Sequence, residues 1–257
     1  MLYIKIVLFK MFNNKKKLQT YFKSATYKIF KIIYGEVKGK ISHKDSEDIN
    51  LRKVQIGNSY YDVYICDNCS FYTDRLHDSA VIKNNKIVEG PSFQLRNNIN
   101  VDCLENSVIQ IGTPKIRKQF KGTVLSLLTG GGGNANYWHW LLDVLPRLEI
   151  IKKLDIENMI DYYLFPSLDK KFQEQTLDVI NIPVKKRLSS KDFRHFFADK
   201  ILVTSHPYTL LNDPRSDSLN IPNWISNYLR YTFKEKAIQK STIKSFPEKI
   251  YINREGL

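Results

Sequence analysis

The pattern of apolar and polar residues divides the chain into four parts, of which the first is helical. Near the N-terminus, apolar residues recur every three or four positions with lysines between them, which is the spacing of an amphipathic helix. These apolar residues are Leu18, Phe22, Ala25, Ile29 and Ile33. The polar stretch 36–50 contains glycine, serine and aspartate and predicts a linker. Residues 1–50 are therefore expected to form a basic amphipathic arm followed by a linker.

The second part, residues 51–121, has the composition of β-strands. Its candidate strands include the apolar runs 60–65 and 108–111. Residues 80–89 contain two further apolar runs separated by Asn84 and Asn85, which predicts a hairpin that turns at these asparagines. We therefore expect a β-rich segment that precedes the main domain.

The third part, residues 122–248, alternates between strand-like and helix-like segments. Its candidate strands are 123–128, 162–165 and 201–204, and its candidate helices are 136–154, 170–180 and 222–237. Alternation of this kind predicts an α/β domain in which helices cover a parallel, Rossmann-like sheet. Residues 249–257 begin with another strand-like run, 249–253. They are expected to start a second domain, so that the chain would be the first half of a longer protein.

The candidate helix 136–154 aligns polar and ionisable residues along one edge. With 100° per residue and His139 at zero, Asp143 lies at about 40°, Asn136 at about 60° and Arg147 at about 80°, beside a broad apolar face. A histidine four residues from an aspartate can donate a hydrogen bond to it, which makes the imidazole a better general base. His139 and Asp143 are therefore candidate catalytic residues.

Features next to these two residues suggest a bound phosphate. A glycine run that includes Gly132 and Gly133 precedes the helix, and its backbone N–H groups could contact a phosphate at the helix N-terminus. Arg147 could bind the same phosphate through two hydrogen bonds. Pro146 predicts a kink, because it lacks the N–H that would bond to the carbonyl of Leu142. The alignment of Arg147 with the rest of the edge depends on this kink.

A purely structural interpretation of the same residues is open. His139 and Asp143 could satisfy one another, Arg147 could form a surface salt bridge, and the glycine run could be a hinge. The spacing alone favours this structural interpretation.

Other candidates for chemistry are weaker. Cys66 and Cys69 lack a second pair of zinc ligands at a suitable spacing, and no Asp-x-Asp motif that could hold a metal is present. No metal site is therefore expected. His77 and His206 stand in turn-like stretches and are expected to be structural or solvated.

The positive charge is concentrated in the N-terminal arm. The 257 residues carry a net charge of +14, and residues 1–40 contain ten lysines and one acid, which gives +9. Because the remainder is only mildly basic, a nucleic-acid groove through the fold is not expected. Two interpretations of the arm carry equal weight. Residues 1–40 could contact anionic lipid head groups, or the apolar stripe could pack against the rest of the protein.

Hydropathy and cysteine content indicate a cytoplasmic protein. No window approaches about 20 uncharged apolar residues, so a transmembrane helix is not expected. Lysines interrupt the apolar run at the N-terminus, and no small-residue cleavage site follows it, which argues against a signal peptide. Three cysteines cannot all be paired within the chain, which predicts a reducing compartment. The expected location is the cytoplasm, with peripheral contact at the inner face of the membrane.

One stretch of the sequence resembles the signature of a known enzyme family. Residues 136–148 read Asn-Tyr-Trp-His-Trp-Leu-Leu-Asp-Val-Leu-Pro-Arg-Leu. This resembles the Asn-Tyr-x-His-Trp-Leu-x-Asp-x-Leu-Pro-Arg-Leu stretch of glycosyltransferase family 61, whose bacterial members include capsular and other surface polysaccharide biosynthesis proteins. Looser similarity to this family extends to 77–81 and to 249–254.

The resemblance implies an inverting enzyme of the GT-B architecture that does not depend on a metal. The family motif carries over to Asn136, His139, Asp143, Pro146 and Arg147, and the later strand carries over to Arg254. In such enzymes the second domain binds the nucleotide-sugar donor. The resemblance therefore implies substrate-binding or catalytic roles for the polar residues among these and implies that this chain holds the acceptor side.

The function implied in this way is the transfer of a sugar from a nucleotide sugar to a surface polysaccharide or another glycan, which can be lipid-linked. No cofactor other than the donor substrate is implied. Because the motifs that follow Arg254 in the family are not part of this sequence, the chain by itself is expected to be inactive. The alternative is a non-catalytic module that binds a membrane surface or a partner.

Overall fold

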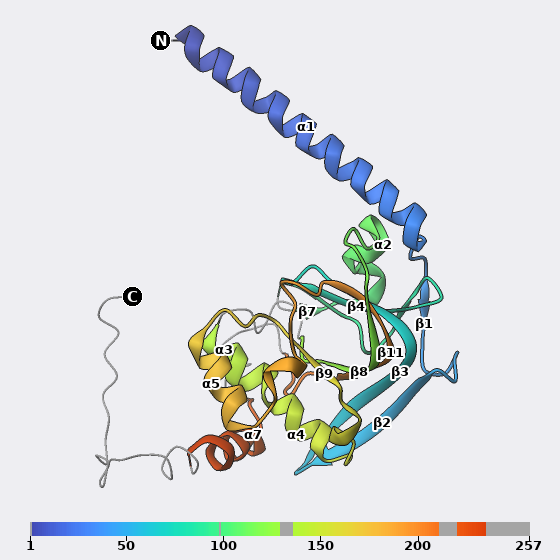
Figure 1. The fold of residues 1–257 in the computed structure, drawn as a ribbon, viewed down its shortest axis with the longest axis vertical. Helices are drawn as coiled ribbons and strands as arrows, with labels where there is room; N and C mark the ends of the chain where they lie inside the picture. The colour runs from blue at the N-terminus through green and yellow to red at the C-terminus, as the bar shows by residue number, and fades with distance from the viewer. Residues whose placement is uncertain (1, 98, 129–135, 211–219, 235–257) are drawn as a thin grey trace, which may run out of the picture.

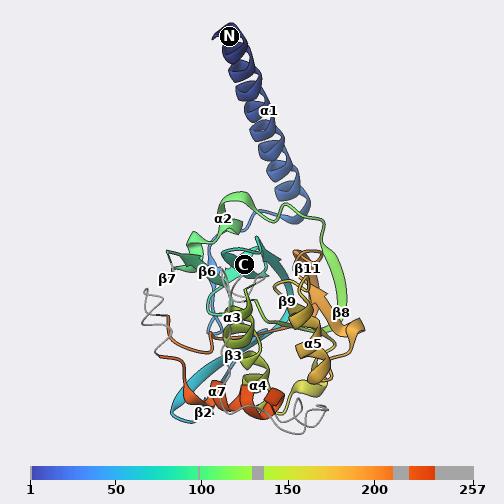
Figure 2. The ribbon, with the colours of Figure 1, turned by 90° about the vertical axis from the view of Figure 1, so that its left-hand side faces the viewer.

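The protein consists of one strongly curved mixed sheet, helices on one side of it, and a long N-terminal helix that projects away from the rest (Figures 1 and 2). The computed structural model describes residues 2–97, 99–128, 136–210 and 220–234, with side chains from residue 17 onward. Within these residues the sheet has 11 strands. The combination of helices and a mixed sheet places the protein in the α/β class.

The strands follow the chain in three groups, namely a β-rich N-terminal group, β8, and a C-terminal group. They are β1 (Lys40–Ile41), β2 (Ile49–Ile56), β3 (Ser59–Thr73), β4 (Asp78–Lys83), β5 (Lys86–Val88), β6 (Phe93–Arg96), β7 (Ile99–Asn100), β8 (Lys118–Ser126), β9 (Tyr162–Phe165), β10 (Arg187–Ser189) and β11 (His195–Thr204).

The α-helices lie before, between and after these strands. They are α1 (Leu2–Tyr34), α2 (Ser107–Ile111), α3 (Tyr137–His139), α4 (Pro146–Lys152), α5 (Lys171–Val179) and α7 (Asn223–Leu229). Two π-helical segments, η2 (Trp140–Val144) and η5 (Arg230–Lys234), continue α3 and α7. Short 3₁₀ turns are η1 (Cys103–Glu105), η3 (Glu157–Met159) and η4 (Val184–Lys186).

Four strands of the sheet are parallel and are arranged so that the chain changes direction beside β8. The order is β11-β8-β9-β10, and each neighbouring pair is parallel. The chain runs from β8 outward to β9 and β10, and β11 then lies on the other side of β8. On its outer side β11 pairs with β3 in the antiparallel sense, so the parallel strands and the β-rich segment share one sheet. The boundaries expected between domains stay predictions.

Hydrophobic side chains fill both faces of the curved sheet. On one face, Val63, Leu125 and Leu202 of the sheet pack in one cluster with Trp140 of η2 and Ile150 of α4. Figure 2 shows α3 and α4 in front of the sheet on this side. The other face includes Cys66, Phe71, Val124, Phe196 and Ile201, which meet because the sheet curls around them. All three cysteines are free and buried.

Most sequence-based elements are confirmed. The strand predicted at 162–165 is β9, and the run 60–65 lies inside β3. The segments 123–128 and 201–204 fall largely in β8 and β11. The helices predicted at 170–180 and 222–237 correspond to α5 and to α7 with η5, although residues 235–237 lie outside the described residues, as does the strand predicted at 249–253.

Two sequence-based elements are wrong. Residues 108–111, predicted as a strand, belong to helix α2, because the Asn106 side chain caps the Val108 N–H and Gly112 ends the helix at φ 69°. These two ends override the strand preference of valine and isoleucine. The linker predicted at 36–50 contains β1, which pairs with β5, and the first residues of β2.

The hairpin predicted at residues 80–89 is confirmed as the turn between β4 and β5, and its effect on stability can be tested by mutation. Asn84 and Asn85 have φ angles of 50° and 57°, a left-handed conformation that asparagine tolerates better than alanine does. We expect Asn84→Ala to lower the free energy of unfolding by about 1 kcal/mol, measured by urea denaturation. The matched control is Asn58→Ala, an equally exposed asparagine without a positive φ, which should leave stability unchanged. Equal effects of the two changes would contradict this explanation of the turn.

Candidate functional site

The predicted helix 136–154 is present, but a π-turn interrupts its α-helical geometry. The Asn136 side chain accepts a hydrogen bond from the Trp138 N–H at 2.9 Å and so caps α3. The Leu145 N–H then bonds to the carbonyl of Trp140, five residues back, at 3.1 Å. Pro146 starts α4 directly afterwards. The wider turn accommodates the proline, which cannot donate to Leu142, and π-turns occur frequently at functional sites.

His139 and Asp143 form the direct contact expected from their spacing. Nδ1 of His139 lies 2.7 Å from Oδ2 of Asp143. The carboxylate is 2% exposed, whereas the imidazole side chain is 36% exposed. Within the described part of the chain, Nε2 of His139 has no hydrogen-bond partner. The pair therefore consists of a buried carboxylate and a partly exposed histidine.

Two residues from the loop after β11 complete the environment of Asp143. The Tyr208 hydroxyl donates to Oδ1 of Asp143 at 2.6 Å, and Nε2 of His206 lies 3.9 Å from Oδ2. Nδ1 of His206 is 2.8 Å from the carbonyl oxygen of Tyr208. One buried carboxylate thus lies between an exposed imidazole and a second imidazole.

The environment shifts the pKa values of the pair in opposite directions. Burial raises the pKa of Asp143, but the hydrogen bonds from His139 and Tyr208 and the proximity of His206 outweigh it and lower the pKa well below the ordinary range. The hydrogen bond to Asp143 raises the pKa of His139 against the opposing effect of burial. Asp143 is therefore charged at neutral pH, and it makes His139 more basic.

Arg147 holds the helix to the end of the neighbouring strand. Its Nε donates to the carbonyl of Asp143 at 3.0 Å, and its Nη1 donates to the carbonyl and the hydroxyl of Thr204 at 2.9 and 3.3 Å. The residue is 1% exposed, and burial lowers its pKa to about 10 while the charge of Asp143 opposes this shift. These bonds support a structural role for Arg147, and phosphate binding by it stays a prediction.

These residues meet where the parallel strands change direction. The α3–η2–α4 helix follows β8, and Thr204, His206 and Tyr208 stand at the carboxyl end of β11, beside β8 in the sheet. In open α/β sheets ligands bind outside the carboxyl ends of the strands at such a point. His206, expected to be structural or solvated, is largely buried and lies beside Asp143. Its position after the strand-like run 201–204 is the signal that could have indicated this.

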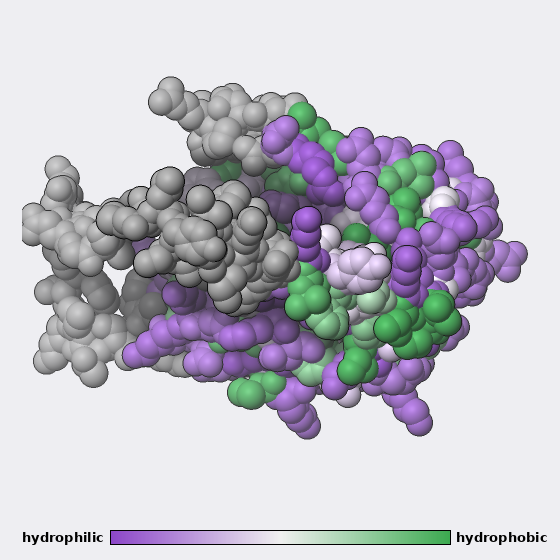
Figure 3. Space-filling view, turned by 90° about the horizontal axis from the view of Figure 1, so that it is seen from above, coloured by the Kyte–Doolittle hydropathy of each residue, from purple (hydrophilic) through white to green (hydrophobic). Residues whose placement is uncertain are grey.

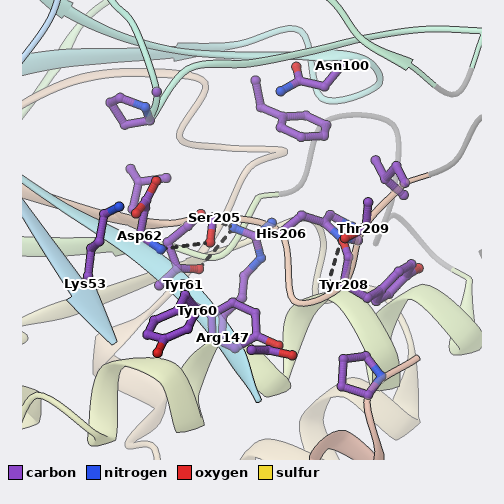
Figure 4. Close-up of a pocket in the computed structure, with 18 of the residues that line it drawn as sticks. Lys53, Tyr60, Tyr61, Asp62, Asn100, Arg147, Ser205, His206, Tyr208 and Thr209 are labelled. Carbon is purple, nitrogen blue, oxygen red and sulfur yellow. Dashed lines mark hydrogen bonds between the residues drawn. The ribbon is translucent and has the colours of Figure 1, made fainter. Parts of the chain in front are cut away.

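A cavity of about 1070 Å³ opens beside the Asp143 contacts. Arg147, His206 and Tyr208 line it from α4 and from the loop after β11, and Figure 4 shows Asn100 across the cavity from them. Residues of β3 form a further wall that includes Tyr60 and Asp62. The lining combines aromatic rings with hydroxyl, amide and charged groups, which suits a ligand that carries many hydroxyl groups.

The remaining predicted site residues are not part of this arrangement. Asn136 is exposed, serves as a helix cap and does not line the cavity. Gly132, Gly133 and Arg254 lie outside the described residues. Among the residues that the structure describes, no group of three or more histidine, cysteine, aspartate or glutamate side chains could hold a metal ion.

Comparison with known proteins does not assign a family. No family model, no curated protein and no solved structure matches the chain. In the part of the chain that the structure describes, no helix combines the length and the hydropathy needed to span a membrane.

Proposed function

We propose that the protein is a glycosyltransferase that transfers a sugar from a nucleotide sugar to a hydroxyl group of a glycan. The observation that carries this proposal is the hydrogen bond of 2.7 Å between His139 and Asp143, in which Asp143 is buried and charged and His139 is accessible. A sugar hydroxyl must lose its proton as it attacks the donor, and an oriented, neutral imidazole can accept that proton.

In this proposal Asp143 holds the Nδ1–H tautomer of His139, so that Nε2 is the atom that takes the proton. Tyr208 donates to the second carboxylate oxygen and keeps Asp143 in place. Asp143 also stabilises the imidazolium that forms when His139 is protonated. The same arrangement of base and carboxylate occurs in other enzymes that activate hydroxyl groups.

The position and the lining of the cavity support a carbohydrate ligand. The cavity lies at the change of direction beside β8, and its polar groups include Asp62, Asn100 and His206. Asparagine and carboxylate side chains can bind neighbouring hydroxyls, and tyrosine rings offer flat apolar surface. We assign this part of the chain to a Rossmann-like half of a GT-B enzyme that binds the glycan acceptor. The resemblance of 136–148 to glycosyltransferase family 61 adds independent support.

The test is a transfer assay on the whole protein as the cell makes it, supplied with nucleotide sugars and with surface glycan from the same organism. We expect release of the nucleotide that depends on the acceptor, together with a glycan product of increased mass. Calorimetric titration of the present chain should detect binding of the glycan. Glycan binding without any transfer by the whole protein would contradict the proposed glycosyltransferase activity and favour a non-catalytic binding module.

The rate of sugar transfer should fall at acidic pH, because His139 must be unprotonated to act as the base and Asp143 raises its pKa. A general base works only when unprotonated, and the pKa of His139 is raised by Asp143, so activity should fall as the pH drops through a value above the ordinary 6.5 or so. We expect Asp143→Asn to move this acid limb of kcat/KM to lower pH. The measurement is the pH profile of both proteins. An unchanged limb in the variant would show that another group titrates.

A further inference from the structure

In the part of helix α1 whose side chains the structure describes, from residue 17 onward, the contacts with the body of the protein lie at the C-terminal end of one face. The Tyr34 ring meets the His195 ring edge-on at 4.8 Å, and its hydroxyl accepts a hydrogen bond from the Arg117 N–H at 3.0 Å. Phe30 stacks on Tyr34 at 5.8 Å, and Lys31 pairs with Glu36 at 3.0 Å. The rest of α1 extends away from the body, as both ribbon views show (Figures 1 and 2).

The apolar stripe of α1 points away from this attachment. With Leu18 at zero and 100° per residue, Tyr27, Phe30 and Tyr34 lie at about 180°, 120° and 160°. The stripe lies between about −60° and +60°. Its large members are each 54–84% exposed, and they are Leu18, Tyr21, Phe22, Ile29, Ile32 and Ile33. The structure therefore decides against packing of this stripe on the body, which was one of the two interpretations of the arm.

The exposed apolar stripe of α1 is unfavourable in water. The residues around it are strongly basic. Exposed hydrophobic residues lie among hydrophilic ones on the face seen from above (Figure 3). Lys17 and Lys28 border the stripe at about −100° and −80°. The first acidic residue of the chain is Glu36, and residues 1–40 carry +9. The same spacing continues in the sequence toward the N-terminus, at Ile4, Val7 and Met11.

We propose that α1 lies in the surface of an anionic lipid bilayer, with its apolar stripe among the lipid chains, its lysines among the head groups and the body on the aqueous side. A helix with one apolar face and a lysine-rich remainder binds membranes in this orientation. Each lysine near an anionic surface strengthens binding about fivefold. A second copy of the chain is a poorer occupant, since it would bring two arms of +9 together. This inference goes beyond sugar transfer and does not depend on it.

The test is sedimentation of the full chain with vesicles, made either of phosphatidylcholine mixed with phosphatidylserine or of phosphatidylcholine alone. We expect Phe22→Ser with Ile29→Ser to weaken binding to the mixed vesicles about 100-fold, at about tenfold for each buried side chain. The matched control is Gln19→Ser with Thr20→Ser, two exposed positions off the stripe, and it should bind like the wild type.

A second variant examines the charge. Lys17→Gln, Lys23→Gln and Lys28→Gln together should weaken binding to the anionic vesicles about 100-fold and leave binding to phosphatidylcholine unchanged. Circular dichroism confirms that each variant keeps its helix. Equal binding of the stripe variant and its control would overturn the proposal. So would a wild-type dimer that does not bind vesicles and becomes monomeric in the stripe variant, because a second copy would then cover the stripe.

Discussion

Replacing His139 with glutamine is expected to lower kcat for sugar transfer by about 10²–10⁴-fold, the contribution of a general base. Glutamine has a similar shape and can still donate a hydrogen bond to Asp143, but it cannot accept the proton of the attacking hydroxyl. KM for the glycan should change much less than kcat, because a general base acts in the transition state and adds little to binding of the ground state. The measurement is steady-state transfer by the whole protein at the pH of maximal activity.

His206→Gln is the matched control for this prediction. His206 also lies next to Asp143, but it lines the cavity and contacts the Tyr208 carbonyl. Its replacement should raise KM for the glycan and affect kcat much less. If His206→Gln abolished turnover while His139→Gln retained it, the roles of the two histidines would be reversed. Full activity of both variants would exclude an imidazole base at this site.

Replacing Arg147 with methionine is expected to lower the free energy of unfolding by about 3–5 kcal/mol, the cost of removing one partner from a buried charged cluster. Methionine fills a similar volume, but the carbonyls of Asp143 and Thr204 lose their donors, and the buried Asp143 carboxylate loses the nearby positive charge. The loss should be measured by denaturant unfolding at neutral pH.

Arg52→Met is the matched control, because Arg52 is exposed on β2 and the structure gives it no ion pair among the described residues. A change at such a surface position should stay within about 0.5 kcal/mol. If the Arg147 variant were as stable as this control, Arg147 would not hold α4 to the end of β11. A role in ligand binding would then be the better explanation for its position beside the cavity.

Local patterns predicted many elements because those elements are determined by residues close together in the sequence. The hairpin at Asn84 and Asn85 follows from two residues that tolerate positive φ, and β9 follows from a short apolar run. The strand predicted at 108–111 was wrong because residues next to this segment, and not its own composition, determine its conformation. The side chain of Asn106 and the positive φ of Gly112 decide that segment, and they stand just outside it.

Part of the candidate site could also be predicted from the spacing of residues in the sequence. His139 and Asp143 lie four residues apart on a helix, so their contact follows from helical geometry, and it survives the π-turn. The role of Arg147 was harder to predict from the sequence. Its distance along the helix places it near Asp143, but in place of the surface salt bridge considered for it, the buried side chain bonds to the end of a distant strand. Phosphate binding by Arg147 stays a prediction.

From sequence alone came the amphipathic character of the arm, the alternation of strands and helices, and the His139–Asp143 pair, because each depends on periodicity within a few turns of chain. The tertiary structure added what depends on sheet order. It brings Tyr208 to Asp143 across 65 positions and opens the cavity beside them, because β11 pairs with β8 at the change of direction. It also turns the apolar face of α1 away from the body, because Tyr34 attaches the helix by the opposite face.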